Sequence, residues 1–311
     1  MSRAINRRTA LGSLAATLIA RPELSAAQGA TPKITTIDSD FSYPEGVLLD
    51  NGKLYVADIL REQIVVFDSA RLQRENVISL TSCGPTAIAP FVSDQIVVDC
   101  HMTAHLAILT KSGELKQNIV STINNRPIPW PNDSTSDGDG GVFITSSGVF
   151  DPNAPATGAV MHVSRTSQVT VMAERFHYAN GITYDPVKRE LFVTEHFANK
   201  VWLFVLDEVF SIRERRVFFD LSPLPAPNVP PFFGIGPDNL HFRANGDLIV
   251  PNYGGGRFLI VSRTGQLKQI VDVPTQFITD AVELDGDILF IGSFELSSPH
   301  PKGILGRVHM A

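Results

Sequence analysis

A strand-like motif recurs six times along the chain, and this repeat constrains the fold more than any other feature. The copies are LYVAD from Leu54, QIVVD from Gln95, VFITS from Val142, LFVTE from Leu191, LIVPN from Leu248 and LFIGS from Leu289. They begin 41, 47, 49, 57 and 41 residues apart. A period of about 40 to 50 residues is typical of β-propellers and is not explained by a β-sandwich or a barrel.

The sequence around each copy supports the same interpretation. Most copies follow a turn signal such as DNG at Asp50 or DGD at Asp285, and most precede a third apolar strand. Five copies are followed by a fourth strand, whereas the sixth reaches Ala311 without one. The segment KITTIDS at Lys33–Ser39 is the predicted replacement. We therefore predict an all-β fold, a six-bladed β-propeller of four-stranded antiparallel blades, with the last blade closed by both termini.

This single domain is expected to occupy residues 33–311, with one short helical insertion around LDEVFSIRER. Residues 1–27 are interpreted as an export signal: Arg7 and Arg8 precede a short apolar stretch, and small residues near Ala27 offer a cleavage site. The RR-x-x-L order resembles a twin-arginine signal, with an ordinary signal peptide or a lipid-interacting anchor as the alternatives. The predicted location is periplasmic or secreted.

Charge excludes two classes of partner. Removing residues 1–27 takes away four basic residues and one acidic residue, which leaves 22 basic and 31 acidic residues and a net charge of −9. Nucleic acids and anionic membrane surfaces select concentrated Lys and Arg, so neither is an expected partner. A propeller whose strands are all paired has no open sheet edge, and we expect a monomer or a weak oligomer.

The pair Asn180-Gly181 looks like the tip of a β-hairpin, but the turn DPVKR that follows is the better hairpin tip for LFVTE. Asn180 therefore begins the first strand of its blade. Equivalent positions in three other blades hold Glu45, Asn132 and Asp238. Because first strands line the central channel, these four side chains are expected to converge at one face of the propeller.

Two carboxylates and two amide carbonyls form a set of hard oxygen donors. Such a set suits Ca²⁺, which takes six to eight oxygen ligands, better than Mg²⁺ with its tight octahedron. Zinc prefers His or Cys, and neither residue type aligns at these positions. Calcium is the predicted cofactor, and other divalent cations such as Zn²⁺ or Mn²⁺ remain open.

Several segments together resemble the senescence-marker-protein/gluconolactonase family. They are YPEGV…LYVAD, PNDSTSDGDGGVFIT, ANGITYDPVKRELFVTE and GPDNLHFRANGDLIVPNYGGG, and the resemblance covers nearly the whole mature chain. Members of this family are calcium-dependent six-bladed propeller hydrolases. The arrangement of one Glu, two Asn and one Asp is also similar to that of diisopropyl-fluorophosphatase. The segment ANGITYDPVKRELFVTE, from the fourth blade, is similar to paraoxonases.

The resemblance implies that Glu45, Asn132, Asn180 and Asp238 bind a catalytic metal and that Asp238 acts as the general base of a lactonase. A nucleophilic role for Asp238 is the alternative. Asn239 matches a DN pair of paraoxonases and is either a fifth ligand or a turn residue.

The sequence departs from the relatives at two places, at Trp130 and at the positions where paraoxonases carry two His residues in blade 2, which here hold Thr86 and either Cys100 or the adjacent His101. Trp130 stands where gluconolactonases often carry an Arg that meets sugar hydroxyls, so it would offer an apolar wall and one donor to the substrate. His101 follows the second strand of blade 2 and is either a proton carrier or a structural residue. Asn132 and Asn180 are also expected to contact the substrate, as is Phe233 in the proline-rich loop before Asp238.

Cys83 precedes the first strand of blade 2 and Cys100 follows its second, so both cysteines are expected at the face of the predicted metal site. In an exported protein they are expected to form a disulfide, with two separate buried thiols as the alternative. The bond would close a loop of about 18 residues and contribute roughly 3 kcal/mol.

The leading hypothesis is a calcium-dependent hydrolase that opens sugar or aliphatic lactones, with the metal as Lewis acid and Asp238 as base. An arylesterase or phosphotriesterase on the same scaffold is the closest alternative. A non-catalytic propeller that calcium stabilises is the alternative from another class.

Overall fold

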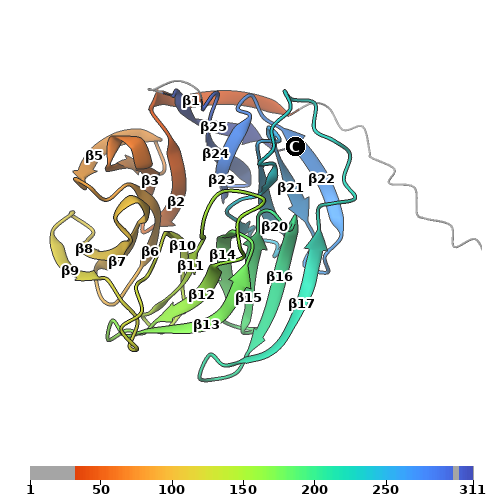
Figure 1. Cartoon of the computed structure of the whole chain (residues 1–311). Coiled ribbons are helices and arrows are strands. Elements are labelled where there is room, and N and C mark those ends of the chain that lie inside the picture. The colour runs from red at the N-terminus through yellow and green to blue at the C-terminus, as the bar shows by residue number, and fades with distance from the viewer. Residues whose placement is uncertain (1–31, 297–300, 311) are drawn as a thin grey trace, which may run out of the picture. The chain divides into compact units, whose positions relative to one another are not determined.

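Six antiparallel sheets arranged around a central axis make up the structure, a computed structural model that describes residues 32–296 and 301–310. Five sheets contain four strands, and in the remaining one the innermost strand is split into two short pieces (Figure 1). This confirms the predicted six-bladed β-propeller. The predicted export signal, residues 1–27, lies outside the described residues.

The first three blades follow one another along the chain. Blade 1 contains β2 (Pro44–Asp50), β3 (Lys53–Asp58), β4 (Gln63–Asp68) and β5 (Gln73–Ser79). Blade 2 contains β6 (Pro85–Pro90), β7 (Gln95–Cys100), β8 (His105–Thr110) and β9 (Leu115–Ile119). Blade 3 contains β10 (Pro131–Ser136), β11 (Val142–Ser146), β12 (Gly158–Val163) and β13 (Val169–Phe176). Two 3₁₀ turns, η1 (Ile59–Arg61) and η2 (His101–Thr103), follow the second strands of blades 1 and 2.

The remaining blades complete the ring. Blade 4 contains β14 (Ala179–Asp185), β15 (Glu190–Glu195), β16 (Lys200–Leu206) and β17 (Ile212–Asp220). Blade 5 contains β18 (Gly236–Pro237), β19 (His241–Phe242), β20 (Leu248–Tyr253), β21 (Arg257–Val261) and β22 (Leu267–Asp272). Blade 6 contains β23 (Phe277–Leu284), β24 (Asp287–Ser293), β25 (Gly303–His309) and β1 (Lys33–Phe41).

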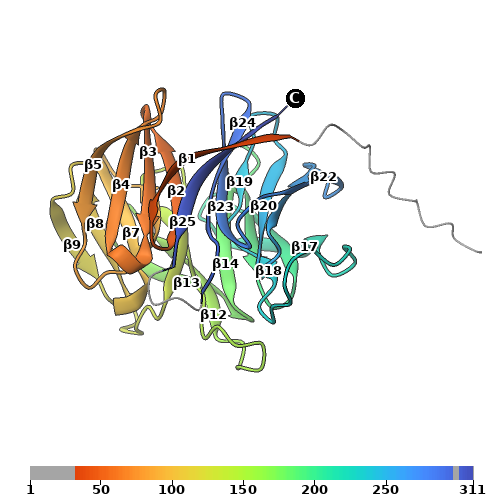
Figure 2. The same cartoon turned by 90° about the horizontal axis from the view of Figure 1, so that it is seen from above.

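The closure of blade 6 follows the predicted arrangement. Strand β1, from the N-terminal part of the described chain, pairs antiparallel with β25, and Lys33 faces His309 in the register. Figure 2 shows the two strands side by side along their length. The segment that the sequence analysis assigned to this role, Lys33–Ser39, lies within β1. The ring is therefore closed by hydrogen bonds between the two ends of the propeller.

Apolar residues on the faces of the blades form six separate clusters, and each cluster fills the space between two neighbouring blades. The cluster between blades 1 and 2, for example, contains Ile64 and Ile96, both fully buried. Burying an aliphatic or aromatic side chain of this size contributes roughly 1.5 to 3 kcal/mol. Continuous apolar runs such as QIVVF and LFIG therefore suit strands that are covered on both faces by adjacent blades.

One sequence expectation is wrong: the stretch LDEVFSIRER contains no helix. The Asp207 carboxylate accepts hydrogen bonds from the backbone N–H groups of Val209 and Ser211 and so forms a turn. Phe210 adopts a positive φ of 60° and packs its ring edge-on against Phe143. The residues of the stretch from Ile212 onward belong to β17. Side-chain capping of the turn by Asp207 competes with helix formation in this segment.

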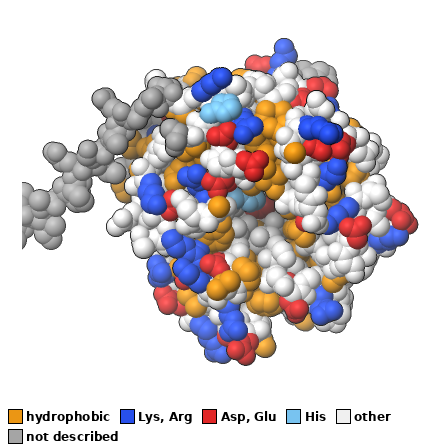
Figure 3. All heavy atoms as spheres, turned by 180° about the vertical axis from the view of Figure 1, so that it is seen from behind, with side chains coloured by type: hydrophobic (Ala, Val, Ile, Leu, Met, Phe, Trp, Pro, Cys, Tyr) orange, Lys and Arg blue, Asp and Glu red, His pale blue; other side chains and the backbone are white. Residues whose placement is uncertain are grey.

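No helix in the described part of the chain is long and apolar enough to cross a membrane. On the face drawn in Figure 3, Lys and Arg side chains are interspersed with Asp and Glu.

Candidate functional site

The predicted ligand residues lie at matching points of their blades, where the innermost strand departs from regular pairing. In blade 4 the register shifts between Ala179 and Ile182, so Asn180 and Gly181 bulge out of the ladder. The inner strands of blades 1 and 3 shift at the same point, and the inner strand of blade 5 is interrupted around Asp238. A bulge re-aims the side chain that it carries.

These bulges bring the four side chains together in one pocket of about 220 Å³. Its walls are formed by Tyr43, Glu45, Ile59, Thr86, His101, Asn132, Phe150, Tyr178, Asn180, Asp238 and Tyr253. All four predicted ligands are in this set, so the structure places them in the convergent arrangement that strand order alone suggested. No Lys or Arg is among the pocket residues.

The pocket brings two carboxyl groups together without a Lys or Arg in its wall. Burial, together with the nearby carboxyls of Asp280 and Asp133, raises the pKa of Glu45 to about 8. Burial and the Glu45 carboxyl raise the pKa of Asp238 well above its usual range, and an interaction with the Asn180 side chain offsets part of this effect. Burial raises these values because it penalises the charged form, so a bound cation would relieve a real electrostatic cost.

Two of the pocket oxygens are buried without a hydrogen bond to any described residue: Glu45 Oε2 and Asn180 Oδ1. Buried polar atoms are normally satisfied, so these two oxygens point to a missing partner. Among the described residues, no three His, Cys, Asp or Glu side chains gather as a metal-binding group by themselves. The site instead combines two carboxylates with two amides, and this all-oxygen set fits a hard divalent cation such as Ca²⁺.

Two buried carboxylates outside the pocket wall, Asp133 and Asp280, hold the backbone next to the predicted ligands. Asp133 Oδ2 accepts a 2.7 Å hydrogen bond from the N–H of Ile182, two residues after Asn180. Asp280 Oδ2 accepts a 2.8 Å hydrogen bond from the N–H of Val47, two residues after Glu45. Each of these bonds links one blade to the next, so the ligand positions are fixed by neighbouring blades as well as by their own strands.

Gly181 is required for a close backbone contact and not for the hairpin turn that Asn-Gly usually signals. A Cβ at this position would lie 2.5 Å from both the Asp238 carbonyl oxygen and the Asn239 Cα. The backbone of blade 5 therefore passes too closely for any side chain after Asn180. Glycine is required here because of this approach between blades 4 and 5.

Asn239 is buried but does not line the pocket. Its Nδ2 donates a 3.2 Å hydrogen bond to the backbone oxygen of Glu45. The structure thus places Asn239 as a link between the Asp238 and Glu45 segments.

The remaining predicted substrate-binding residues divide into two groups. Asn132, Asn180 and His101 line the pocket, and His101 Nδ1 donates to the Pro131 carbonyl oxygen across 3.0 Å. Burial lowers the pKa of His101, which favours the neutral imidazole. Trp130 is 40% exposed and Phe233 is 70% exposed, and neither is part of the pocket wall.

Four aromatic residues of the pocket were not identified from the sequence: Tyr43, Phe150, Tyr178 and Tyr253. The Tyr43 and Tyr253 hydroxyls are hydrogen-bonded at 2.7 Å. The Phe150 ring packs edge-on against Tyr178, with 4.9 Å between ring centroids. One available signal was that Tyr43 and Tyr178 each stand two residues before a ligand, whereas Phe150 lies in a loop and has no such marker.

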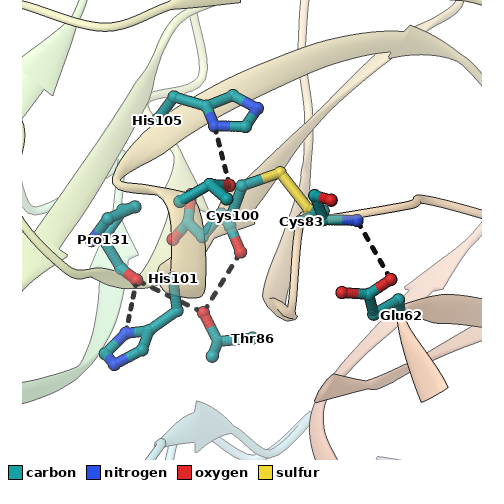
Figure 4. The surroundings of a disulfide bond; sticks show 10 residues. Glu62, Cys83, Thr86, Cys100, His101, His105 and Pro131 are labelled. Carbon is teal, nitrogen blue, oxygen red and sulfur yellow. Dashed lines mark hydrogen bonds between the residues drawn. A yellow bond between two sulfur atoms is a disulfide. The ribbon is translucent and has the colours of Figure 1, made fainter. Parts of the chain in front are cut away.

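Cys83 and Cys100 form the expected disulfide. Cys100 directly precedes His101, so the bond lies beside the pocket (Figure 4).

A family model described as "SMP-30/Gluconolactonase/LRE-like region" matches residues 43–294. Among curated proteins, the chain is 24% identical over 221 residues to "Lactonase drp35" of Staphylococcus epidermidis. The match covers 69% of this chain and 64% of that relative, so the chain spans just under two thirds of the relative's length.

Two solved structures illustrate the likeness in three dimensions. A luciferin-regenerating enzyme superposes with a TM-score of 0.73 and 18% identity, covering 90% of this chain and 95% of the other. A regucalcin from Agrobacterium tumefaciens, described as a calcium-binding protein, gives a TM-score of 0.69 and 17% identity, with coverages of 87% and 92%. At these identities the likeness establishes the fold.

Proposed function

This chain belongs to the SMP-30/gluconolactonase/LRE-like family, and from that premise we propose that it is a calcium-dependent hydrolase that opens lactones. One observation carries the proposal. Two carboxylates and two amide side chains converge in a pocket without a Lys or Arg, and two of their oxygens are buried with no hydrogen-bond partner among the described residues. The similar protein named lactonase and the similar structure described as calcium-binding support the same interpretation.

Glu45, Asn132, Asn180 and Asp238 would hold the cation, because all four line the pocket and all offer oxygen. A bound Ca²⁺ would polarise the lactone carbonyl and favour the ionised form of Asp238.

Asp238 is the proposed general base. Its carboxylate takes a proton from a water molecule, and the water oxygen forms a bond with the carbonyl carbon of the lactone. The ring C–O bond then breaks, and the proton passes from Asp238 to the departing alkoxide. The product is a hydroxy acid, and Asp238 is again ionised for the next cycle.

The aromatic side chains of the pocket would orient the substrate. Phe150 presents an apolar surface, and the three tyrosines present rings that carry hydroxyl groups. This wall also favours a second candidate function, the hydrolysis of aryl esters or phosphotriesters, since aromatic rings pack well against aromatic leaving groups. Both candidates use the same base and the same cation.

We further propose that the protein acts in the periplasm or outside the cell. The signal-like residues 1–27 motivate this location, and a disulfide is typical of oxidising compartments. Fractionation of cells that produce the protein tests it, because a cytoplasmic pool with both thiols free to alkylate would contradict export.

The activity is tested by hydrolysis of a panel of substrates: glucono-, xylono- and simple aliphatic lactones, an aryl ester and an organophosphate. Each is measured with the purified protein, after EDTA treatment, and after Ca²⁺ is restored. We expect lactone turnover that disappears on chelation and returns with calcium. Preference for the aryl ester or the organophosphate would favour the second candidate. Binding of calcium without turnover of any substrate would make a non-catalytic binding propeller the better interpretation.

A further inference from the structure

The carbonyl oxygen of Pro131 receives two hydrogen bonds from blade 2, although blade 2 contributes no carboxylate or amide ligand to the site. His101 Nδ1 donates to it across 3.0 Å, and the single Thr86 hydroxyl hydrogen is shared between this oxygen, at 3.4 Å, and the Asp99 carbonyl oxygen, at 3.3 Å. Figure 4 shows both side chains pointing toward this oxygen. Pro131 directly precedes Asn132, so blade 2 supports the residue next to a proposed ligand.

The position of His101 depends in turn on the disulfide. Cys100, the residue before His101, is bonded to Cys83. The same two segments are joined by backbone hydrogen bonds, from His101 N to Gly84 O at 3.1 Å and from Met102 N to Cys83 O at 3.2 Å. The covalent bond and the two hydrogen bonds together anchor the start of η2, from which the His101 ring reaches Pro131 (Figure 4).

Blade 4 contains a matched arrangement without a disulfide. His196 follows the second strand of blade 4 as His101 follows that of blade 2, and its Nδ1 lies 3.2 Å from the carbonyl oxygen of Pro237, the residue before Asp238. The other ring nitrogen, Nε2, lies 2.8 Å from the Gly234 carbonyl oxygen. Burial lowers the pKa of His196 to about 4, so the neutral ring carries one N–H and donates to only one of these two carbonyls, between which it lies.

His101 Nε2, in contrast, makes no hydrogen bond to any residue that the structure describes, and the ring lines the pocket. The His196 ring lies between two carbonyls, whereas the His101 ring has one hydrogen bond and a backbone that the disulfide holds at the preceding residue.

We propose that the Cys83–Cys100 disulfide is a positioning element of the site: it fixes His101, and through the Pro131 carbonyl it fixes Asn132 for cation binding. His101 is accordingly a positioning residue. Groups that orient metal ligands typically change metal affinity or activity by about 10- to 100-fold when they are removed. The proposal rests on the calcium site proposed above, and its test includes a measurement on the metal-free protein.

Calorimetric titration of the metal-free protein with Ca²⁺ gives the first readout. We expect the Cys83→Ala/Cys100→Ala variant to bind calcium about tenfold more weakly than the unaltered protein, and His101→Ala to do the same. His101→Asn, whose amide can still donate to Pro131, should recover part of the loss. Because the disulfide acts through His101, a variant that combines the cysteine substitutions with His101→Ala should bind calcium no more weakly than the weaker-binding of the two separate variants.

A control separates positioning from a general loss of stability. Ile260 is buried in the cluster between blades 5 and 6, away from the pocket, and Ile260→Ala lowers the melting temperature without touching blade 2. Hydrogen exchange of peptides covering residues 129–136 gives the second readout, in metal-free protein. Exchange there should accelerate in the cysteine and His101→Ala variants and remain unchanged in Ile260→Ala.

Three results would overturn the proposal: unchanged calcium affinity and exchange in the cysteine variant, equal effects in Ile260→Ala, or additive effects of the cysteine and His101 substitutions. Failure of the unaltered protein to bind calcium would contradict the proposed function instead. In that case the exchange of residues 129–136 in the metal-free variants still decides whether the disulfide positions this segment.

Discussion

The hydroxyl of Thr194 in blade 4 donates a 2.8 Å hydrogen bond to the backbone carbonyl of Asp238 in blade 5. The same Oγ1 accepts a 2.7 Å hydrogen bond from the N–H of Gly181. One side chain thus joins the segments that carry two of the proposed ligands. Thr279 donates in a similar way to the Pro44 carbonyl, the residue before Glu45. Threonines on neighbouring blades therefore fix the backbone on which the site is built.

Thr194→Val tests this link with little change in volume. The substitution leaves the Gly181 N–H and the Asp238 carbonyl without their partner, which is expected to lower the free energy of unfolding by about 1 to 3 kcal/mol. Calcium affinity should fall about tenfold because the ligand segments lose support. Denaturant unfolding and calorimetry measure the two effects.

The matched control is Thr183→Val in the same blade. Thr183 is also buried, but its hydroxyl makes no hydrogen bond to the described residues. We expect calcium affinity to stay unchanged in this variant. Equal calcium affinities in Thr194→Val and the unaltered protein would contradict the role given to Thr194.

Gly181→Ala should disrupt the site more than any loop substitution. The added Cβ would approach backbone atoms of Asp238 and Asn239 to 2.5 Å, so blades 4 and 5 have to separate locally. Overpacking of this kind costs about 1 to 3 kcal/mol or more, and calcium binding should be lost with it. Gly246→Ala is the control, since its Cβ meets no atom within 4 Å and only its positive φ of 84° is strained. Normal calcium affinity in Gly181→Ala would show that the blades tolerate the change.

Asp238→Asn removes the proposed base and one negative charge while keeping the shape of the side chain. We expect lactone turnover to fall by at least about 10²-fold, which is the contribution typical of general acid–base catalysis. Asp287→Asn is the same chemical change at the start of β24 in blade 6, where Asp287 pairs with Arg307, and it should retain full kcat/KM. Turnover by Asp238→Asn near that of the control would assign the base to another residue.

The raised pKa of Glu45 predicts an unusual pH dependence of stability in the metal-free protein. Its pKa is about 8 in the folded state against 4.5 for an unperturbed carboxyl. Between these values the folded state binds more protons than the unfolded state, so the free energy of unfolding decreases as pH rises. With respect to Glu45, the free energy of unfolding is therefore highest below pH of about 4.5, and this part of the stability is lost as pH rises through about 8.

Calorimetric melting of the metal-free protein from pH 5 to pH 8 should therefore give a falling Tm. Calcium should flatten the decrease of Tm with pH, because a bound cation takes the place of the proton on Glu45. The increase in Tm that calcium produces should therefore grow with pH. Glu45→Gln is the control and should lose part of the slope. A Tm of metal-free protein that rises over this range would contradict the electrostatic description of the pocket.

Strand positions could be predicted from the sequence because hydrophobic runs, turn signals and a 41- to 57-residue spacing repeat along the chain. The closing strand Lys33–Ser39 could be predicted because the sixth copy is one strand short. Convergence of the four oxygens followed from strand order alone, since first strands face the channel.

Other features depend on contacts that the sequence does not display. The need for Gly181 arises from the backbone of a different blade, whereas Asn-Gly by itself signals a turn. Phe150 reaches the pocket from a loop, and its ring packs there against Tyr178. The mistaken helix at LDEVFSIRER had helix-forming residues, and it was overridden by side-chain capping from Asp207 and by pairing of β17 with β16.

The most direct test of the central claim is calorimetric titration of chelator-treated protein with Ca²⁺, beside Glu45→Gln and Asn180→Ala. If Glu45, Asn132, Asn180 and Asp238 hold the cation, the unaltered protein binds one calcium ion with high affinity in this pocket, and each variant weakens that binding by at least about tenfold. A binding isotherm that stays the same in both variants, or the absence of calcium binding to the unaltered protein, would contradict the claim.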